Sequence, residues 1–220
     1  MKVDMHMHTR GSFDCLTDPH ALVQRALDRG IDRVCVTDHN EIDAALDLHR
    51  AYPDRVIVGE EVKTAEGVDI IGLFLSERIP RETPARETCE RIRAQGGIVY
   101  VPHPFATGKG GGGSILPAIE DLIDALEGFN ARLHDPALNT RAVDWARSRD
   151  IPVGAGSDAH TLREVGRAWA EVPTFAGPRE FLGALRSGTI HGSSSSRLVH
   201  VASTWAKVHK SAVRQLSRGR

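Results

Sequence analysis

Segments with the composition of strands alternate with segments of helical pattern along most of this 220-residue chain. Runs rich in β-branched residues cover positions 31–40, 55–62, 97–105 and 151–160, and apolar residues at helical spacing fill much of the sequence between them. A strand that is regularly followed by a helix is typical of a parallel sheet or barrel with helices on its outside. We therefore predict an α/β protein built on one largely parallel sheet or barrel.

The first helix carries clear signals at both ends. Asp18 and Pro19 are a capping residue followed by a proline suited to the first turn, and Gly30 ends the helical pattern. Only a short connection that contains TAEG at 64–67 separates the strand at 55–62 from the one at 68–75, so these two strands are predicted to form a hairpin. Further helices are expected at 41–50, 84–95, 119–125, 136–149 and 178–187.

Residues that bind metals recur at or just after the ends of the predicted strands. In the first strand, Asp4, His6 and His8 alternate, so an extended backbone turns all three to one face. Two surface histidines near a chain terminus are the simpler alternative for this motif alone. The repetition favours a metal site, because the carboxyl ends of the strands form the active site in parallel α/β proteins. The later members of the series are Asp38, His39, Glu60, Glu61, His103, Asn130, His134, Asp158 and His160.

The donor set indicates the kind of metal and one residue that bridges two ions. Histidine with carboxylate and without thiolate suits zinc, manganese or iron, and favours a hydrolytic centre of several ions. Such ions activate a water and hold phosphoryl oxygens. A bridging carboxylate gives one oxygen to each ion, and we assign this role to Glu61. Its neighbour Glu60 points the opposite way in a strand.

Five motifs, taken together and in order, resemble the PHP family, named for polymerase and histidinol phosphatase. They are D-x-H-x-H-T at 4–9, T-D-H-N at 37–40, G-x-E at 59–61, H-P at 103–104 and G-S-D-A-H at 156–160. The resemblance implies a distorted (β/α)7 barrel, a trinuclear metal site and phosphoesterase activity.

The resemblance also implies a ligand set when it is carried over position by position. Where many members have a histidine before I-I-G, this chain has Asp69, so the sequence leaves a centre of two or three ions open. Glu61, Asp158 and Arg132 are the residues expected to act on substrate, although a salt bridge is an equal alternative for Arg132. By analogy, one ion takes His6, His8, Glu61 and Asp158, a second takes Asp14, His39 and His160, and a third takes Glu61 and His103, with His134 close by.

Composition limits the classes of protein to consider. A hydrophobic content of 40% supports a sizeable core, and a formal net charge of −1 gives no general attraction to nucleic acid or membranes. Three cysteines without paired spacing indicate reduced thiols, and no segment has the pattern of a signal peptide or a membrane span. We therefore expect a cytoplasmic protein. The sequence indicates no oligomeric state.

Two segments differ from the rest of the chain. The glycine-rich run at 108–114 is expected to be a flexible lid or a linker, since it lacks the spacing of a phosphate-binding loop. The segment 205–220 is basic without any acidic residue and is expected to be a surface or frayed helix. We expect one phosphoesterase domain over 1–204, including a PHP-associated segment from about residue 120.

The function expected from these observations is metal-dependent hydrolysis of a small phosphomonoester or a nucleotide by a metal-activated water. Histidinol phosphate is one candidate substrate, and a nucleic-acid substrate is less favoured because the chain holds no polymerase. A metal-stabilised binding or regulatory module without turnover is the alternative from a different class.

Overall fold

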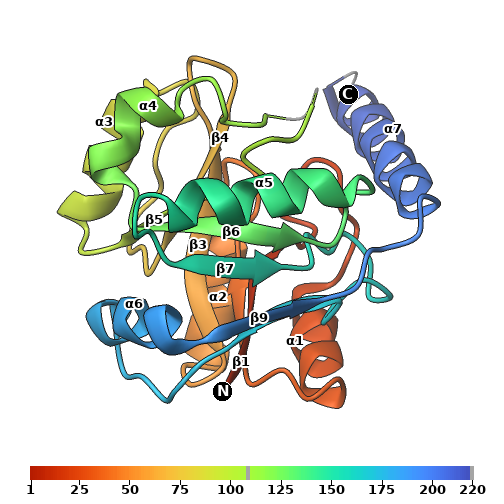
Figure 1. Ribbon diagram of the computed structural model, residues 1–220. Coiled ribbons are helices and arrows are strands. Elements are labelled where there is room, and N and C mark those ends of the chain that lie inside the picture. The colour runs from red at the N-terminus through yellow and green to blue at the C-terminus, as the bar shows by residue number, and fades with distance from the viewer. Residues whose placement is uncertain (108–109, 219–220) are drawn as a thin grey trace.

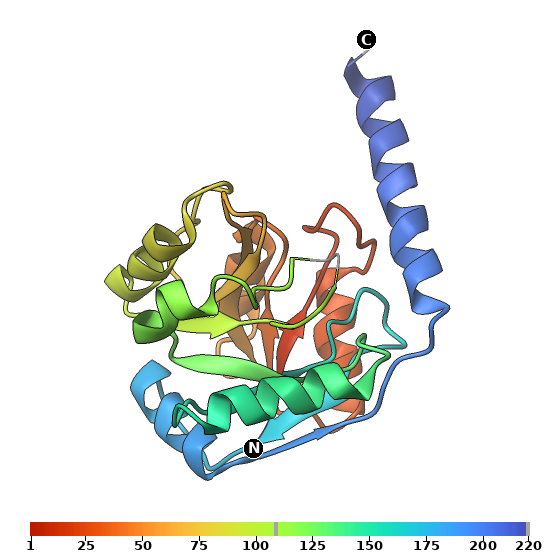
Figure 2. The same ribbon diagram turned by 45° about the horizontal axis from the view of Figure 1, so that its top comes forward.

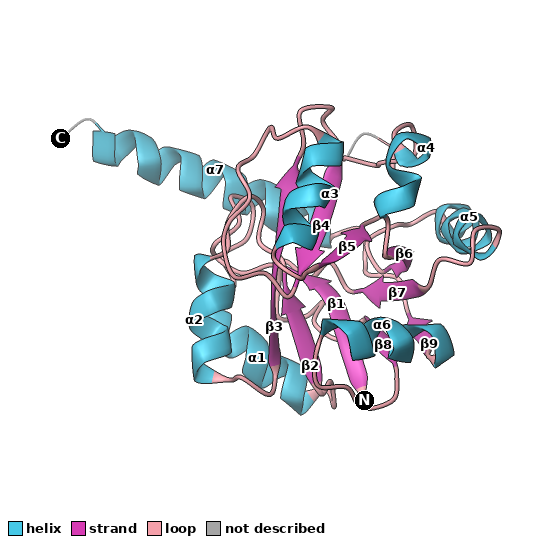
Figure 3. Cartoon of the chain, turned by 90° about the vertical axis from the view of Figure 1, so that its left-hand side faces the viewer, coloured by secondary structure: helices cyan, strands magenta, loops and turns pink. Residues whose placement is uncertain are grey.

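The computed structural model describes residues 1–107 and 110–218 and shows a single nine-stranded sheet surrounded by helices (Figures 1 and 3). Its strands are β1 Lys2–Met7, β2 Arg33–Val36, β3 Val56–Lys63, β4 Asp69–Leu73, β5 Ile98–Val101, β6 Ala125–Asn130, β7 Val153–Gly156, β8 Ala168–Glu171 and β9 Thr189–Gly192. The helices are α1 Pro19–Asp28, α2 Asp43–Ala51, α3 Ala85–Ala94, α4 Leu116–Ile119, α5 Pro136–Arg147, α6 Pro178–Ser187 and α7 Val199–Arg218, with a short 3-10 turn at Glu120–Leu122.

The sheet runs in the order β7-β6-β5-β4-β3-β2-β1-β8-β9 and nearly closes into a barrel. Strands β1, β2 and β3 are parallel to one another, as are β5, β6 and β7, whereas β4 is antiparallel to both of its neighbours. The end of β1 contacts the segment that follows β7. Met7 forms a parallel bridge with Ala159, and the amide of His8 donates to the Ala159 carbonyl at 2.9 Å. The carboxyl ends of β1 and β7 therefore lie side by side.

The predicted hairpin of β3 and β4 is confirmed by their antiparallel register, which pairs Lys63 with Asp69. The chain thus passes from β3 to β4 without a helix, and β8 and β9 add an antiparallel pair beyond β1. The α/β class and the barrel-like form are confirmed. The sheet is mixed, so it departs from a strict repeat of strand and helix.

Two hydrophobic clusters hold the strands in place. Met5, Cys35 and Tyr100 belong to a cluster that joins alternate strand residues to α6, while Val34 and Val36 belong to a cluster beneath the outer helices. The alternation in sequence has therefore separated an inner from an outer face of the barrel.

The first strand changes phase before it reaches the histidines. Met5 packs in the inner cluster, but Met7 packs in the outer one, and the pairing of β1 with β2 shifts register between Asp4 and Met7. An irregularity of this kind alters which side chains share a face. The expectation that Asp4 shares a face with His6 and His8 is therefore wrong, because Asp4 accepts hydrogen bonds from the Ser157 and Gly166 amides.

The predicted helix boundaries are confirmed where a cap defined them. The Asp18 side chain accepts a hydrogen bond from the Ala21 amide at 3.1 Å, and Gly30 has a φ of 71°. The helix expected at 119–125 is wrong, because α4 ends at Ile119 and Ala125 already pairs with Tyr100 in the sheet. The short strand β9 has no counterpart among the sequence predictions.

The two unusual segments have different outcomes. Residues 108 and 109 of the glycine-rich run lie outside the described residues, and at 110 the Gly110 carbonyl accepts from the Asp69 amide at 2.8 Å.

Helix α7 begins at Val199, so the expected boundary at 204 falls inside it, and Figure 2 shows the helix extending away from the barrel. Within the described ranges, no helix has the length and apolar character needed to cross a membrane.

Candidate metal centre

Four donor atoms converge where the barrel closes. The Nε2 atoms of His6 and His8, both on or next to β1, lie 3.1 Å apart. Glu61 Oε2, from β3, lies 3.3 Å and 3.4 Å from these nitrogens. Asp158 Oδ1, just after β7, lies 3.8 Å from His6 Nε2 and 3.4 Å from His8 Nε2. These side chains come from three separated parts of the chain and turn their electron pairs toward one region.

The spacing of these atoms fits a bound divalent cation. Ligands placed 2.0–2.1 Å from a tetrahedral ion are separated from each other by about 3.3 Å. The five separations given above range from 3.1 to 3.8 Å. Two facing imidazole nitrogens beside two carboxylates gain little from one another in a buried site, whereas a cation between them satisfies all four.

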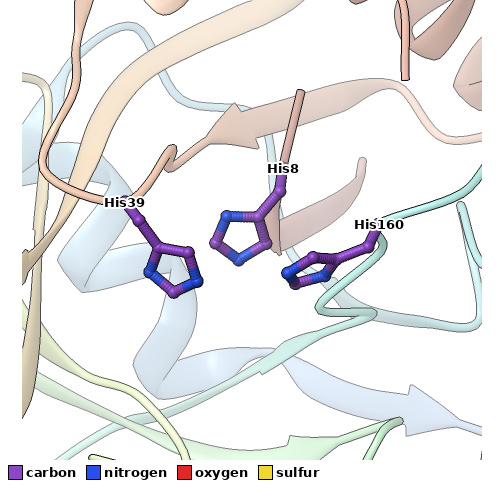
Figure 4. A group of neighbouring side chains, drawn as sticks. All are labelled: His8, His39 and His160. Carbon is purple, nitrogen blue, oxygen red and sulfur yellow. The ribbon is translucent and has the colours of Figure 1, made fainter. Parts of the chain in front are cut away.

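A second group adjoins the first through His8. The rings of His8, His39 and His160 gather with their nitrogen atoms within 4.8 Å of one another, as Figure 4 shows. Asp14 Oδ1 lies 3.3 Å from His160 Nε2 and 3.7 Å from His39 Nε2. Both Asp14 Oδ1 and His160 Nε2 are buried and lack a hydrogen-bond partner, which is the state expected of metal ligands.

Glu61 connects the groups because its two oxygens face different histidines. Oε2 lies 3.0 Å from His39 Nδ1, while Oε1 lies 3.1 Å from His103 Nε2. His6, Glu61 and His103 form a third group of potential ligands. Beside it, Lys63 pairs with Asp69 at 2.6 Å. The geometry suits the bridging role expected of Glu61.

The electrostatics of the cluster favour bound cations. Burial lowers the pKa of His8 to about 3, with help from the neighbouring His160 and His39, so its imidazole is neutral and can donate an electron pair. Burial also opposes charge on His6, but the carboxylates of Glu127, Asp158 and Glu61 outweigh it and raise the pKa of His6. The negative field that holds a proton on His6 equally attracts a metal ion.

Residues around the cluster fix the orientation of its rings. Glu127 Oε1 lies 3.1 Å from His6 Nδ1, and its other oxygen accepts from the His103 amide at 2.7 Å. The Ser12 hydroxyl lies 3.0 Å from His8 Nδ1. Such contacts occupy one ring nitrogen and leave the other for a metal.

Glu60 points away from the cluster, as alternation in the strand predicts. Its Oε2 accepts a hydrogen bond from the Ile79 amide at 2.8 Å, and burial raises the pKa of Glu60 to about 7. The two adjacent glutamates of β3 therefore occupy opposite faces.

Arg132 and His134, which the sequence placed in the site, each contact at least one residue outside the ligand groups. Arg132 is 8% exposed, and its Nε lies 3.0 Å from Glu164 Oε1, its Nη1 2.8 Å from His160 Nδ1 and its Nη2 2.7 Å from the Ser203 hydroxyl. His134 lies outside the three ligand groups found among the described residues, and its Nε2 is 2.9 Å from His200 Nε2. Arg132 and His134 thus connect the rim of the site to α7.

Sequence reasoning missed Glu127 and Glu164. Glu127 is 1% exposed inside the otherwise apolar strand β6, and Glu164 is 1% exposed between the Arg132 guanidinium and the His160 amide. A lone carboxylate within an apolar strand was the available signal for Glu127. Glu164 follows the last motif in a turn, where the sequence carried no such contrast.

Family models match two parts of the chain. The model described as PHP domain matches residues 4–100, and the model described as PHP-associated matches residues 136–190. All the ligand groups described above draw on residues within the first range together with His103, Asp158 and His160.

Two relatives are proteins of Methanocaldococcus jannaschii. The uncharacterised protein MJ0417 is 32% identical over 201 residues, which cover 86% of this chain and 81% of that protein. The uncharacterised protein MJ1587 is 35% identical over 162 residues, which cover 66% of this chain and 90% of that protein.

Solved structures share the fold at low sequence identity. A two-domain protein from Bacteroides vulgatus, described as containing a predicted PHP-like metal-dependent phosphoesterase, aligns with a TM-score of 0.67 and 20% identity over 88% of this chain and 65% of that one. PsfC from Pseudomonas syringae aligns with a TM-score of 0.65 and 18% identity over 96% of this chain and 98% of that one. The lesion-specific endonuclease PfuEndoQ from Pyrococcus furiosus aligns with a TM-score of 0.64 and 18% identity, over 86% of this chain and 57% of that one.

A nearly closed barrel with clustered histidine and carboxylate ligands at its carboxyl edge defines a metal-dependent hydrolase of phosphoester bonds. Within that class, the chain belongs to the PHP family.

Replacing Glu61 by glutamine tests the bridging carboxylate. The amide keeps the shape but loses the charge that two cations would share, so Glu61→Gln should lose at least one metal equivalent and most turnover. Glu60→Gln is the matched control, since Glu60 contacts the Ile79 amide instead, and it should keep the metal content of the parent. Elemental analysis after growth in metal-replete medium should give at least two equivalents for the parent. Loss of metal in Glu60→Gln with retention in Glu61→Gln would reverse the assignment.

Gly156 offers a test that changes no ligand. A Cβ at this position would lie much closer than 3.0 Å to His6 Cβ and Glu127 Oε1. Gly156→Ala should therefore displace the His6 ring and weaken metal affinity by roughly 10–100-fold, as loss of a ring-orienting contact does. Gly183→Ala in α6 is the control, because its Cβ meets nothing within 4 Å. Equal metal affinity for the two variants, measured by competition with a chelating dye, would contradict the close packing at Gly156.

Proposed function

We propose that this protein hydrolyses a small phosphomonoester or a nucleotide at a centre of two or three divalent cations. The observation that carries the proposal is the convergence of His6, His8, Glu61 and Asp158, whose donor atoms lie 3.1–3.8 Å apart in the five pairs measured. The nitrogen and oxygen donors suit zinc, manganese or iron. When bound, such cations lower the pKa of a coordinated water and neutralise charge on phosphoryl oxygens.

The chain's own residues keep the ligands in a reactive arrangement. Glu127 Oε1 lies 3.1 Å from His6 Nδ1 and holds a proton on that nitrogen. The Nε2 atom of His6 is then left with its electron pair. Glu61 divides its two oxygens between the histidines on either side. The side chains of His6, His8 and Glu61 are 0–1% exposed, so bulk water does not compete for these groups.

A cationic side chain stands at the open side of the cluster. Lys207 Nζ lies 3.8 Å from Asp14 Oδ2, and half of its side chain is exposed. Arg132, in contrast, is buried and its nitrogens contact Glu164, His160 and Ser203. We therefore assign the contact with a substrate phosphate to Lys207 and a positioning role to Arg132.

An aromatic ring beside the centre supports a substrate with a flat group. Phe13 is 47% exposed, and its ring centroid lies 5.1 Å from that of His39. An exposed ring in this place can stack on a base or an imidazole. A nucleotide and histidinol phosphate both carry such a group next to a phosphate.

The direct test is a screen of phosphorylated metabolites with metal-reconstituted protein, measured as release of inorganic phosphate. The screen should include mononucleotides, histidinol phosphate and an aliphatic phosphomonoester, with oligonucleotide cleavage followed separately. We expect turnover of at least one monoester that stops when a chelator removes the metal. Metal-loaded protein that is inactive on all of them would favour a binding module instead.

Lys207→Met provides a second measurement on any substrate found. Removing the ammonium group should raise KM about tenfold or more and leave the metal content unchanged, because the methionine chain preserves most of the packing. Arg179→Met, at an exposed position of α6, is the control and should leave KM unchanged. An unchanged KM in Lys207→Met would exclude the phosphate contact without touching the metal assignment.

A further inference from the structure

Helix α7 presents two different faces. One face packs on the rim of the metal site, where Ser203 and Ala206 are 7% and 2% exposed. Ser203 accepts from Arg132 at 2.7 Å, and Lys210 Nζ donates to the Ser12 carbonyl at 2.5 Å. This face fixes the helix to the loop that carries Asp14. The other face looks away from the barrel (Figure 2).

The outer face of α7, together with Leu198 directly before the helix, forms an apolar stripe. It consists of Leu198, Val201, Trp205, Val208 and Ala212. These residues are spaced by three, four, three and four positions, which is the repeat that keeps one seam of a helix facing a partner helix. The four larger side chains are 58–75% exposed. A single exposed apolar residue needs no explanation, but a continuous stripe of this regularity marks an interaction surface.

The charges of α7 are kept away from the stripe. Between Val199 and Val213 the helix has no acidic residue, and its two lysines, Lys207 and Lys210, lie on the side that faces the barrel. The positions that flank the stripe along its length are uncharged or histidine: Ala202, Thr204, His209 and Ser211. The α7 helix of a second copy can therefore approach the stripe without bringing lysines together. An anionic surface at the same place would contact apolar side chains instead of lysines.

The stripe also contains a hollow that can accept a side chain of a second helix. A shallow hollow on the outer face is lined mainly by Val201, Thr204, Trp205 and Val208. Four residues at these spacings form the hole that receives one knob in a helix pair. A repeated apolar seam, uncharged flanks and a four-residue hole together match a copy of α7 itself.

We propose that α7 pairs with α7 of a second copy of this chain through the apolar stripe. A two-fold axis places the same surface on both partners, so the stripe is self-complementary. The stripe from Leu198 to Ala212 spans 15 residues, or about two heptads. Two such stripes bury on the order of 1,000 Å² in total, the size at which specific interfaces begin. Because the opposite face holds Arg132 and the Asp14 loop, pairing also secures the rim of the metal site.

The oligomeric state of the full chain tests the proposal. Sedimentation velocity at micromolar concentration should give a dimer for the parent. Val208→Glu places a charge inside the stripe and should shift the protein to the monomer. Val213→Glu is the matched control, because it makes the same change on the same helix at a residue that is 53% exposed but outside the stripe. It should remain dimeric. Val201→Glu is a second variant within the stripe and should also dissociate.

Two results would overturn the proposal: a parent that is monomeric at tens of micromolar, and equal dissociation of Val208→Glu and Val213→Glu. If the parent is monomeric, sediments with vesicles of phosphatidylglycerol and phosphatidylcholine and loses this binding in Val208→Glu, the stripe is assigned to a lipid surface instead. Circular dichroism and metal content equal to those of the parent show that each variant is folded.

Discussion

The rest of the structure depends on the cluster of buried histidine and carboxylate side chains at the carboxyl edge of the barrel. Asp14, Glu61 and Asp158 lie within a few ångströms of five histidines, and Asp14 and Glu61 are almost completely buried. Removing a carboxylate from water costs several kcal/mol unless opposite charge compensates for it. The imidazoles alone compensate only in part, since His8 is held neutral. Bound cations would complete the balance, and we expect the stability of this edge of the barrel to depend on them.

The fold makes this concentration possible because chain segments that are distant in sequence end at the same edge. Closure of β1 against the end of β7 brings His6 and His8 beside Asp158. Two residues of the site, His103 and Asp158, have positive φ values of 29° and 51°. Backbone in this region is disfavoured for residues other than glycine and persists where surrounding contacts require it. Here the turn directs each side chain back over the barrel.

The sequence predicted the parts of the structure that rest on local rules. The cap at Asp18, the hairpin of β3 and β4 and the inward direction of Glu61 each follow from residues close together in the chain. The phase change in β1 did not follow, because it depends on pairing with β2. The contacts of Arg132 with Ser203 and of His134 with His200 depend on where α7 docks, which no local pattern encodes. Short β9 and the early end of α4 likewise follow from pairing within the sheet.

Crystals grown with manganese or zinc, examined by anomalous diffraction, test the central claim most directly. Cations held by the described ligands should give one anomalous peak among His6, His8, Glu61 and Asp158, and a second beside Asp14, His39 and His160. Each peak should lie about 2.0–2.2 Å from its ligand atoms. Anomalous density that is absent from both positions in metal-replete crystals, or found only at other surfaces of the protein, would contradict the account.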